Sequence, residues 1–277
     1  SDSVRLLIAD RKEHAEKLAA GINNLNAKRR ELDNEITKEA LSMIERDTRL
    51  RDAKSTVLFN ENWQKGVIGI VASRLTDSYY RPTIVLTRSN NLITGSARSI
   101  RSFDIYDAID NCSDLLEHFG GHKYAAGLSL KPENLPEFMR RFEEYVSANI
   151  ENEELVPELN VDLEINFSDI TPKFVRVLKQ FAPFGPGNMS PVFLTKNVVD
   201  AGTSRSVGDK KHLKLTIFQQ NAPDNIFAGI AFQKGHIYNR VHSREPFDMC
   251  YCIEKNFWQG KTNLQLNVKD IKFPEEY

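Results

Sequence analysis

Hydrophobic side chains recur at spacings of three, four or seven residues between positions 11 and 47, with charged side chains between them. They are Leu18, Ile22, Leu25, Leu32, Ile36 and Met43. This spacing predicts one long amphipathic helix. Because the apolar stripe is sparse and is interrupted at Arg29 and Glu39, we expect a connector packed against neighbouring domains rather than a coiled coil. The short apolar run at 4–8 has the pattern of a strand.

From residue 55 onward, short β-branched runs alternate with helical patterns. Strands are expected at 55–59, 83–87, 92–98 and 125–130, and helices at 66–75, 104–118 and 133–150. Strands and helices that alternate in this way predict an α/β layer over residues 50–150.

Beyond an acidic stretch at 151–158 that contains proline, the pattern is mostly of strands. They are expected at 159–165, 192–201, 212–218, 226–232, 247–254 and 264–271, with one helix at 171–181. Such a run of strands predicts a small barrel, for which the OB fold is the natural candidate. We therefore expect three parts: a linker with the long helix at 1–50, an α/β domain at 51–152 and a mostly β, OB-fold-like domain at 153–277.

Composition excludes several classes of protein. The chain is 40% hydrophobic and 27% charged, which is ordinary for a globular protein. No apolar run approaches the ~20 residues that cross a bilayer, and the N-terminus has no signal-peptide pattern, so we expect a cytoplasmic protein without membrane contact. The three cysteines include no CxxC pair, which favours neither a disulfide framework nor a zinc site.

The net charge of -1 is distributed unevenly along the chain. Residues 131–170 hold three basic and eleven acidic side chains, whereas residues 171–216 hold eight basic and two acidic ones. Binding to a polyanion requires local positive potential rather than a basic total. The stretch 171–216 is therefore a candidate to contact backbone phosphates, with a merely solvated basic face as the alternative.

A glycine pair followed by histidine and lysine lies at 120–123, between a predicted helix and a predicted strand. Gly120 and Gly121 allow a tight turn whose amides approach an anion, while His122 adds a hydrogen bond and Lys123 a charge. The alternative is a helix C-cap, which explains both glycines without a ligand.

A second candidate lies at the end of the strand predicted for 92–98. Here Arg98 is flanked by the hydroxyls of Ser96 and Ser99. The planar guanidinium can bond two phosphate oxygens at once, although a solvated strand end has a similar sequence.

These motifs resemble one family. The runs WQKGVIGIVASRL at 63–75, YRP at 80–82, SARS at 96–99 and GGH at 120–122, with AAG at 125–127, resemble the DHH-associated domain of RecJ exonucleases. The run FAPFGPGN at 181–188, with PVF at 191–193, extends the resemblance into the OB-fold domain of that family. The resemblance covers nearly the whole chain, since residues 1–50 look like the family's interdomain linker helix.

The resemblance implies the substrate-binding C-terminal part of an enzyme that degrades single-stranded DNA from the 5′ end in repair and recombination. Such enzymes use two metal ions, manganese or magnesium, held by a DHH domain. This chain contains no Asp-His-His and no Asp-x-Asp sequence, so we expect no catalytic residue, metal ligand or cofactor in it, and no activity from it alone. Single-stranded DNA is the expected partner, with a single-strand-binding protein or a helicase as candidate protein partners.

By position, the family's phosphate clamp falls on Ser96 and Arg98, completed by His122 and by the amides of Gly120 and Gly121. In the barrel, three basic side chains are expected to lie along the backbone of the bound DNA strand; they are Lys210, Lys211 and Lys214. Strand aromatics are expected in the core; they are Phe218, Phe227 and Phe232.

Two other functions remain open at this point. One is a DHH-type phosphoesterase of short oligonucleotides or dinucleotides, against which a barrel able to bind long strands argues. The other is an OB-fold module that contacts a protein partner, against which the basic stretch at 171–216 argues.

Overall fold

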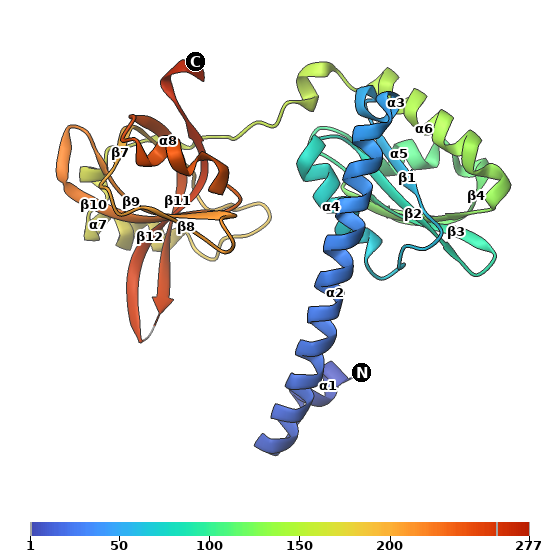
Figure 1. Cartoon of the computed structure of the whole chain (residues 1–277), viewed down its shortest axis with the longest axis horizontal. Helices are drawn as coiled ribbons and strands as arrows, with labels where there is room; N and C mark the ends of the chain where they lie inside the picture. Colours follow the sequence, from blue (N-terminus) through green and yellow to red (C-terminus); the bar gives the residue numbers. More distant parts are fainter. Residues whose placement is uncertain (1, 259, 277) are drawn as a thin grey trace. The chain divides into compact units, whose positions relative to one another are not determined.

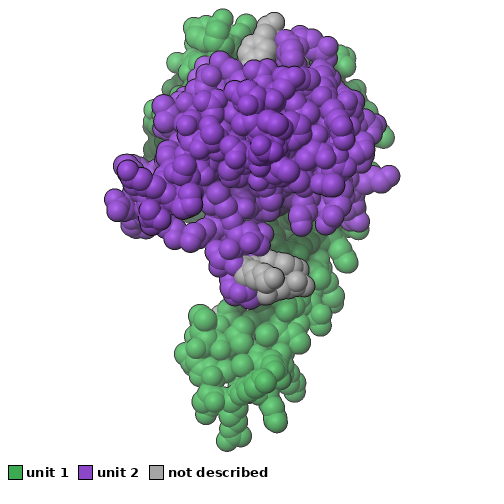
Figure 2. All heavy atoms as spheres, turned by 90° about the vertical axis from the view of Figure 1, so that its left-hand side faces the viewer, with its two compact units in different colours: residues 1–157 green, residues 158–277 purple. Residues whose placement is uncertain are grey.

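The computed structural model describes residues 2–258 and 260–276. The chain divides into two compact units, residues 1–157 and 158–277 (Figure 2). Within the described residues, none of the helices combines the length and apolar character that a membrane span requires. The division of the chain into three domains stays a prediction.

The long helix predicted for unit 1 is confirmed. Helix α2 spans Lys12–Arg46 (Figure 1) and is followed by the short α3, Thr48–Asp52. Only the second half of α2 is buried, where Ile36, Ala40 and Ile44 join the core that α4, Ile68–Tyr79, also enters. The connector therefore packs on the α/β layer through its last turns.

The strand predicted at 4–8 is wrong, because this segment belongs to helix α1, Asp2–Leu7. A strand needs a neighbour to satisfy its backbone groups, whereas a helix bonds them internally. Arg5 and Asp2, one turn apart, form an ion pair of 3.5 Å that fits the helix. α1 then packs against α2 instead of joining a sheet.

Unit 1 is built on a five-stranded sheet in the order β1-β2-β3-β5-β4. The strands are β1 Thr56–Phe59, β2 Thr83–Ser89, β3 Leu92–Arg98, β4 Leu116–His122 and β5 Ala125–Leu130. α2 and α4 cover one face over β1 and β2, while α5, Ile105–Asp110, and α6, Leu135–Asn149, cover the opposite face. Beside α4 the face formed by β3, β5 and β4 carries small and polar residues and is uncovered.

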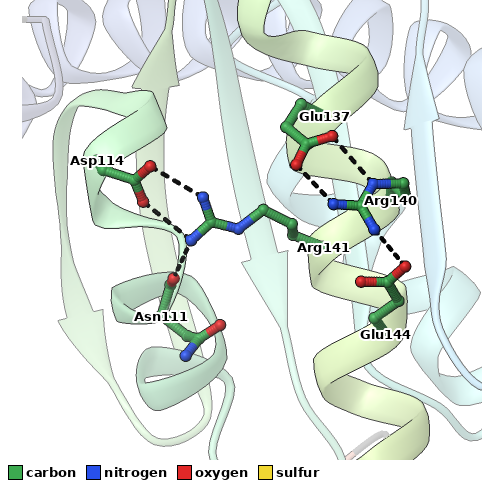
Figure 3. Close-up of polar contacts among 6 residues, drawn as sticks. All are labelled: Asn111, Asp114, Glu137, Arg140, Arg141 and Glu144. Atoms are coloured by element: carbon green, nitrogen blue, oxygen red, sulfur yellow. Dashed lines mark hydrogen bonds and ion pairs between the residues drawn. The ribbon is translucent and has the colours of Figure 1, made fainter.

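The helix predicted for 104–118 is wrong in its second half. α5 ends at Asp110, and β4 follows a 3-10 turn at Ser113–Leu115. Pairing with β5 supplies backbone partners for residues 116–122, where two glycines would weaken a helix. Arg141 of α6 holds the turn by donating to the Asp114 carboxylate and to the carbonyl of Asn111 (Figure 3).

Unit 2 is a closed barrel, which confirms the OB-fold-like architecture. Its ring runs β7-β11-β12-β10-β9 and closes through pairing of β7 with β9. These strands are β7 Phe193–Asp200, β9 His212–Gln219, β10 Ala222–Ala231, β11 Phe247–Trp258 and β12 Lys261–Lys272. β10 and β12 pair in parallel and the other neighbours in the ring are antiparallel.

Shorter elements flank the ring. They are β6 Leu163–Glu164, β8 Arg205–Val207, α7 Pro172–Leu178 and α8 Tyr238–His242. The strand predicted at 159–165 is thus reduced to two residues, since only Leu163 and Glu164 find pairing partners on β7.

A buried hydroxyl relay links three segments of the barrel. The Thr195 hydroxyl lies 2.7 Å from the Ile165 carbonyl oxygen and 2.7 Å from the Tyr251 hydroxyl. Since Thr195 has a single proton and gives it to the carbonyl, Tyr251 must donate to Thr195. Burial raises the pKa of Tyr251, so its hydroxyl keeps the proton that this bond needs.

We expect Thr195→Val to lower the free energy of unfolding of unit 2 by about 2–3 kcal/mol, because it leaves two buried polar groups without partners. Tyr251→Phe should lower it by only about 1 kcal/mol, since Thr195 keeps its bond to Ile165. Urea unfolding followed by circular dichroism compares the two variants. Equal losses would contradict the direction of donation assigned to the relay.

Candidate nucleic-acid interface

Three rows of residues cross β3, β5 and β4 on the face of the sheet beside α4. Residues directly opposite each other in antiparallel strands lie on the same face. The rows are Arg98 with Ala125 and His122, Ser96 with Gly127 and Gly120, and Thr94 with Ser129 and His118. Four predicted site residues from two separate motifs therefore meet on one open face.

The guanidinium of Arg98 is held in place from two sides. Its Nε donates to the Ser73 hydroxyl at 3.1 Å, and its Nη1 donates to the carbonyl of Ala97 at 2.7 Å. Ser73 in turn donates to the carbonyl of Gly69 one turn earlier in α4. Within the residues that the structure describes, no carboxylate lies within 4.0 Å of Arg98, so its charge is available to an anion.

Gly69 and Ser73 of α4 contact the candidate site, which the sequence analysis did not predict. A Cβ on Gly69 would lie 3.0 Å from the Ser96 hydroxyl and 3.2 Å from Nη2 of Arg98. The missing side chain therefore lets α4 approach this row closely. The signal was present in the sequence, since a glycine and a serine four residues apart share one face of a helix, but its meaning depends on where α4 packs.

His122 presents one ring nitrogen to the open face. The backbone N–H of Tyr124 donates to its Nδ1 at 3.2 Å. A neutral imidazole that accepts at Nδ1 carries its proton on Nε2, so Nε2–H can donate to a ligand. Ala125, which lies between Arg98 and His122 in the row, is too small to close the space between them.

The two adjacent glycines have different reasons to be glycine. No atom lies within 4 Å of a Cβ built on Gly120, whereas a Cβ on Gly121 would lie 2.3 Å from the Ala125 carbonyl oxygen. Packing thus requires a glycine at position 121 but does not require one at position 120. At 120 the missing side chain leaves the backbone open to a ligand. The pair forms part of β4, and neither the helix C-cap nor the loop expected from the sequence is present.

β4 is an edge strand of the sheet. Successive amides of a strand point to opposite sides, so one of the two glycine amides points away from β5 and has no partner in the sheet. This agrees with an anion-binding amide at the glycine pair, although only one of the two amides can serve.

Ser99 and Lys123 lie at the end of the same rows. The Ser99 hydroxyl donates to the Phe103 carbonyl at 2.9 Å and its N–H donates to Tyr124, so Ser99 shapes the loop. The carbonyl of Lys123 accepts from Ile105, while its exposed ammonium lies 5.8 Å from the centre of the Tyr124 ring. That phosphate contacts either residue stays a prediction.

The chemistry of this face is that of an anion site. It combines a guanidinium, a serine hydroxyl, an imidazole N–H and an edge amide, all of them donors. No group of three or more His, Cys, Asp or Glu side chains that could hold a metal ion occurs among residues 2–258 and 260–276. These donors match the acceptor oxygens of a phosphate group, and that this face binds one stays a prediction.

In unit 2 the predicted lysines lie at and beside one turn. Lys210 and Lys211 are exposed where β8 turns into β9, and Lys214 pairs across these strands with Arg205. In the described parts of the chain, none of these four cations has a carboxylate within ion-pair distance. The turn is therefore a basic surface of the barrel.

The expectation that Phe232 lies in the core is wrong. Its side chain is 55% exposed and packs edge-on against His212 at 5.3 Å between ring centres. Every second residue at the end of β10 is buried, with Gly229 and Ala231 inward, so the next side chain, Phe232, faces outward. Phe227, in contrast, packs against the core as predicted. An exposed aromatic thus lies beside the basic turn.

Two family models match the chain in succession. The DHHA1 domain matches residues 52–148, and the RecJ OB domain matches residues 161–270. The first range contains the three-row face and the second contains the barrel.

The chain is also similar to whole proteins and solved structures. It is 33% identical over 275 residues to the single-stranded-DNA-specific exonuclease RecJ of Bacillus subtilis, covering 99% of this chain and 34% of that protein. It is 29% identical over 284 residues to the RecJ of Haemophilus influenzae, covering 98% and 48%. The crystal structure of RecJ from Thermus thermophilus in complex with Mn2+ superposes with a TM-score of 0.76 at 25% identity, covering 99% of this chain and 38% of that one.

The fold, the polar face and these matches define a tandem of two domains, a DHHA1 domain followed by an OB domain. The chain spans about a third to a half of the length of the curated relatives it matches. Over both domains it belongs to the RecJ family.

Substitution of the two glycines should separate their roles. Gly121→Ala should destabilise unit 1 by about 2–3 kcal/mol, because the new Cβ overlaps backbone of β5. Gly120→Ala should change the free energy of unfolding by less than about 1 kcal/mol, since the space is open. Urea unfolding of both variants tests this, and a Gly120→Ala variant as unstable as Gly121→Ala would show that packing also fills that space.

Proposed function

We propose that this chain is the strand-binding part of a metal-dependent exonuclease that degrades single-stranded DNA from its 5′ end, with a role in DNA repair and recombination. One observation carries the proposal: Ser96, Arg98 and His122 meet on one open face, beside a Gly120 that no packing explains. The names of the relatives, single-stranded-DNA-specific exonucleases, support the same substrate.

In this proposal the three-row face grips a phosphate of the strand. Arg98 donates through its guanidinium, oriented by Ser73, and His122 donates through Nε2–H from across Ala125. The bare backbone at Gly120 lets the phosphate approach the sheet. Charge-assisted bonds of this kind fix the strand without reading its sequence, as an exonuclease requires.

Cleavage itself is assigned to residues outside this set. Two metal ions would activate water and neutralise the charge that develops on the phosphoryl oxygens. The solved Thermus RecJ structures hold Mg2+ and Mn2+ according to their names. The residues described here contribute a held phosphate rather than metal ligands.

The barrel would hold the same strand away from the scissile phosphate. Lys210, Lys211 and Lys214 match backbone charges, and Phe232 offers a face on which a base can stack. The combination of cations and an exposed aromatic favours nucleic acid over a protein partner, for which a single-strand-binding protein or a helicase would be the candidates. It also favours a long strand over a dinucleotide.

Arg98→Ala should weaken binding of the chain to a labelled single strand by roughly 10- to 100-fold, because one charge-assisted contact is worth about 1.5–3 kcal/mol. The slope of log affinity against log salt should become shallower by about one. Fluorescence anisotropy across a salt series measures both. Arg88→Ala is the matched control, because Arg88 also lies on a strand of the sheet, β2, but is exposed and paired with Glu61. Equal effects of the two variants would argue against the clamp.

Phe232→Ala should weaken binding of the single strand by about 5-fold or more, since stacking of one base is worth about 1–3 kcal/mol. Its affinity for the matching duplex should stay unchanged, because paired bases cannot stack on it. The comparison is made by anisotropy with both DNA forms. Ile226→Ala, at an exposed apolar side chain of β10, shows whether loss of any surface apolar group has the same effect, and an equal loss for duplex would refute stacking.

A further inference from the structure

A narrow groove in unit 2 lies between α7 and the hairpin of β11 and β12. Its walls are apolar and its rim carries two ammonium groups. The apolar residues are Val175, Leu178, Ala182, Phe184, Ile253 and Leu264, and the cations are Lys179 and Lys255. The groove is separate from the basic turn at 208–212, none of whose residues lines it.

The groove begins where the barrel core ends. Ile253, Lys255 and Phe257 alternate along β11 and so share one of its faces, and Leu264 lies opposite Lys255 on β12. Ile253 and Leu264 still pack against the core, whereas Phe257 is 69% exposed. The hairpin extends beyond the rest of the barrel (Figure 1), and it carries the apolar face out of the core into the groove.

Lys179 and Lys255 both line the groove and contact each other, and neither forms an ion pair among the described residues. The direct contact with the ammonium of Lys255 lowers the pKa of Lys179. Neither lysine has a carboxylate within 4.0 Å in the described residues. Glu254 lines the groove as well; its carboxylate keeps its charge, accepts from Asn267 at 2.7 Å and lies beyond ion-pair distance of both lysines. An anion between the two ammonium groups would remove their repulsion.

A braced loop supplies the aromatic wall. The side-chain amide of Asn188 donates to the carbonyls of Phe181 at 2.8 Å and Pro183 at 2.9 Å, and Gly185 exchanges backbone bonds with Asn188. These bonds hold the loop in one shape. Phe184 therefore reaches the groove without having to be ordered on binding, which lowers the entropic cost of an encounter.

We propose that this groove binds one nucleotide of a single-stranded nucleic acid, with its base against Phe184 and its phosphate between Lys179 and Lys255. The proposal rests on the proposed function for the identity of the ligand, and it adds a second contact point on the barrel. Exposed Phe181 and Phe257 beside the groove offer further stacking faces, which favours a strand of bases over an acidic peptide with an apolar side chain.

The first test replaces both lysines. Lys179→Ala combined with Lys255→Ala should weaken binding of a labelled oligothymidylate by about 10-fold or more and make the salt slope shallower by up to about two. The matched control, Lys173→Ala with Lys269→Ala, removes the same charge from two exposed sites outside the groove and should change affinity by less than about 3-fold. Circular dichroism establishes that both double variants are folded.

A second test separates the contribution of the base to binding from that of the phosphate. Phe184→Leu keeps an apolar wall but removes the stacking face, so it should weaken binding of the oligothymidylate and leave binding of a fully abasic strand unchanged. Amine-specific labelling read by mass spectrometry gives an independent measure: the oligothymidylate should protect Lys179 and Lys255 but not Lys269.

The outcomes separate this inference from the proposed function. If Arg98→Ala weakens binding but the lysine pair and its control behave alike, the groove proposal is overturned and the clamp stands. If the pair leaves DNA affinity unchanged but abolishes binding of an acidic peptide with an apolar terminus, the groove is a protein-docking site and the proposal is likewise overturned. A wild-type chain that binds no single strand at low salt would overturn both.

Discussion

The register of β3, β5 and β4 is the constraint on which the candidate interface depends. Gly121 can lie against the carbonyl of Ala125 only because it has no Cβ, and a Cβ on Gly95 would approach a neighbouring side chain to 2.5 Å. Gly95 is buried and Gly121 is exposed, and each leaves room for the strand or side chain beside it. Since side-chain direction alternates, the register then turns Arg98 and His122 to the open face, and a slip of one residue would bury them.

The hydrophobic periodicity of a segment predicted its secondary structure correctly where that structure depends on contacts within the segment itself. The long helix and the strands at 92–98 and 125–130 agree with α2, β3 and β5, because their patterns fit a single period. The segment 104–118 was predicted as one helix, and its buried residues Ile105, Ile109 and Cys112 do follow helical spacing. Its end becomes a strand through pairing with β5, a contact that periodicity within the segment does not encode.

The candidate site was predictable where residue type alone limits the chemistry. An arginine between serines and a histidine after glycines are residue types that favour an anion ligand, although a solvated strand end and a helix cap have similar sequences. What orients Arg98 was not predictable, because Ser73 becomes its partner only when α4 packs beside β3. Phe232 was misplaced for a different reason: it lies five residues after Phe227, and this odd spacing puts the two rings on opposite faces of an extended segment.

Each unit offers cations without an ion-pair partner, in a chain whose net charge is -1. The clamp of unit 1 offers one positioned guanidinium, and the barrel offers the basic turn and the lysine pair. Each contact is weak alone, because exposed charges are screened by salt. A strand held at several points of one chain loses its translational freedom only once, so the contacts reinforce one another. In the proposed function, affinity should therefore rise with the length of the bound strand.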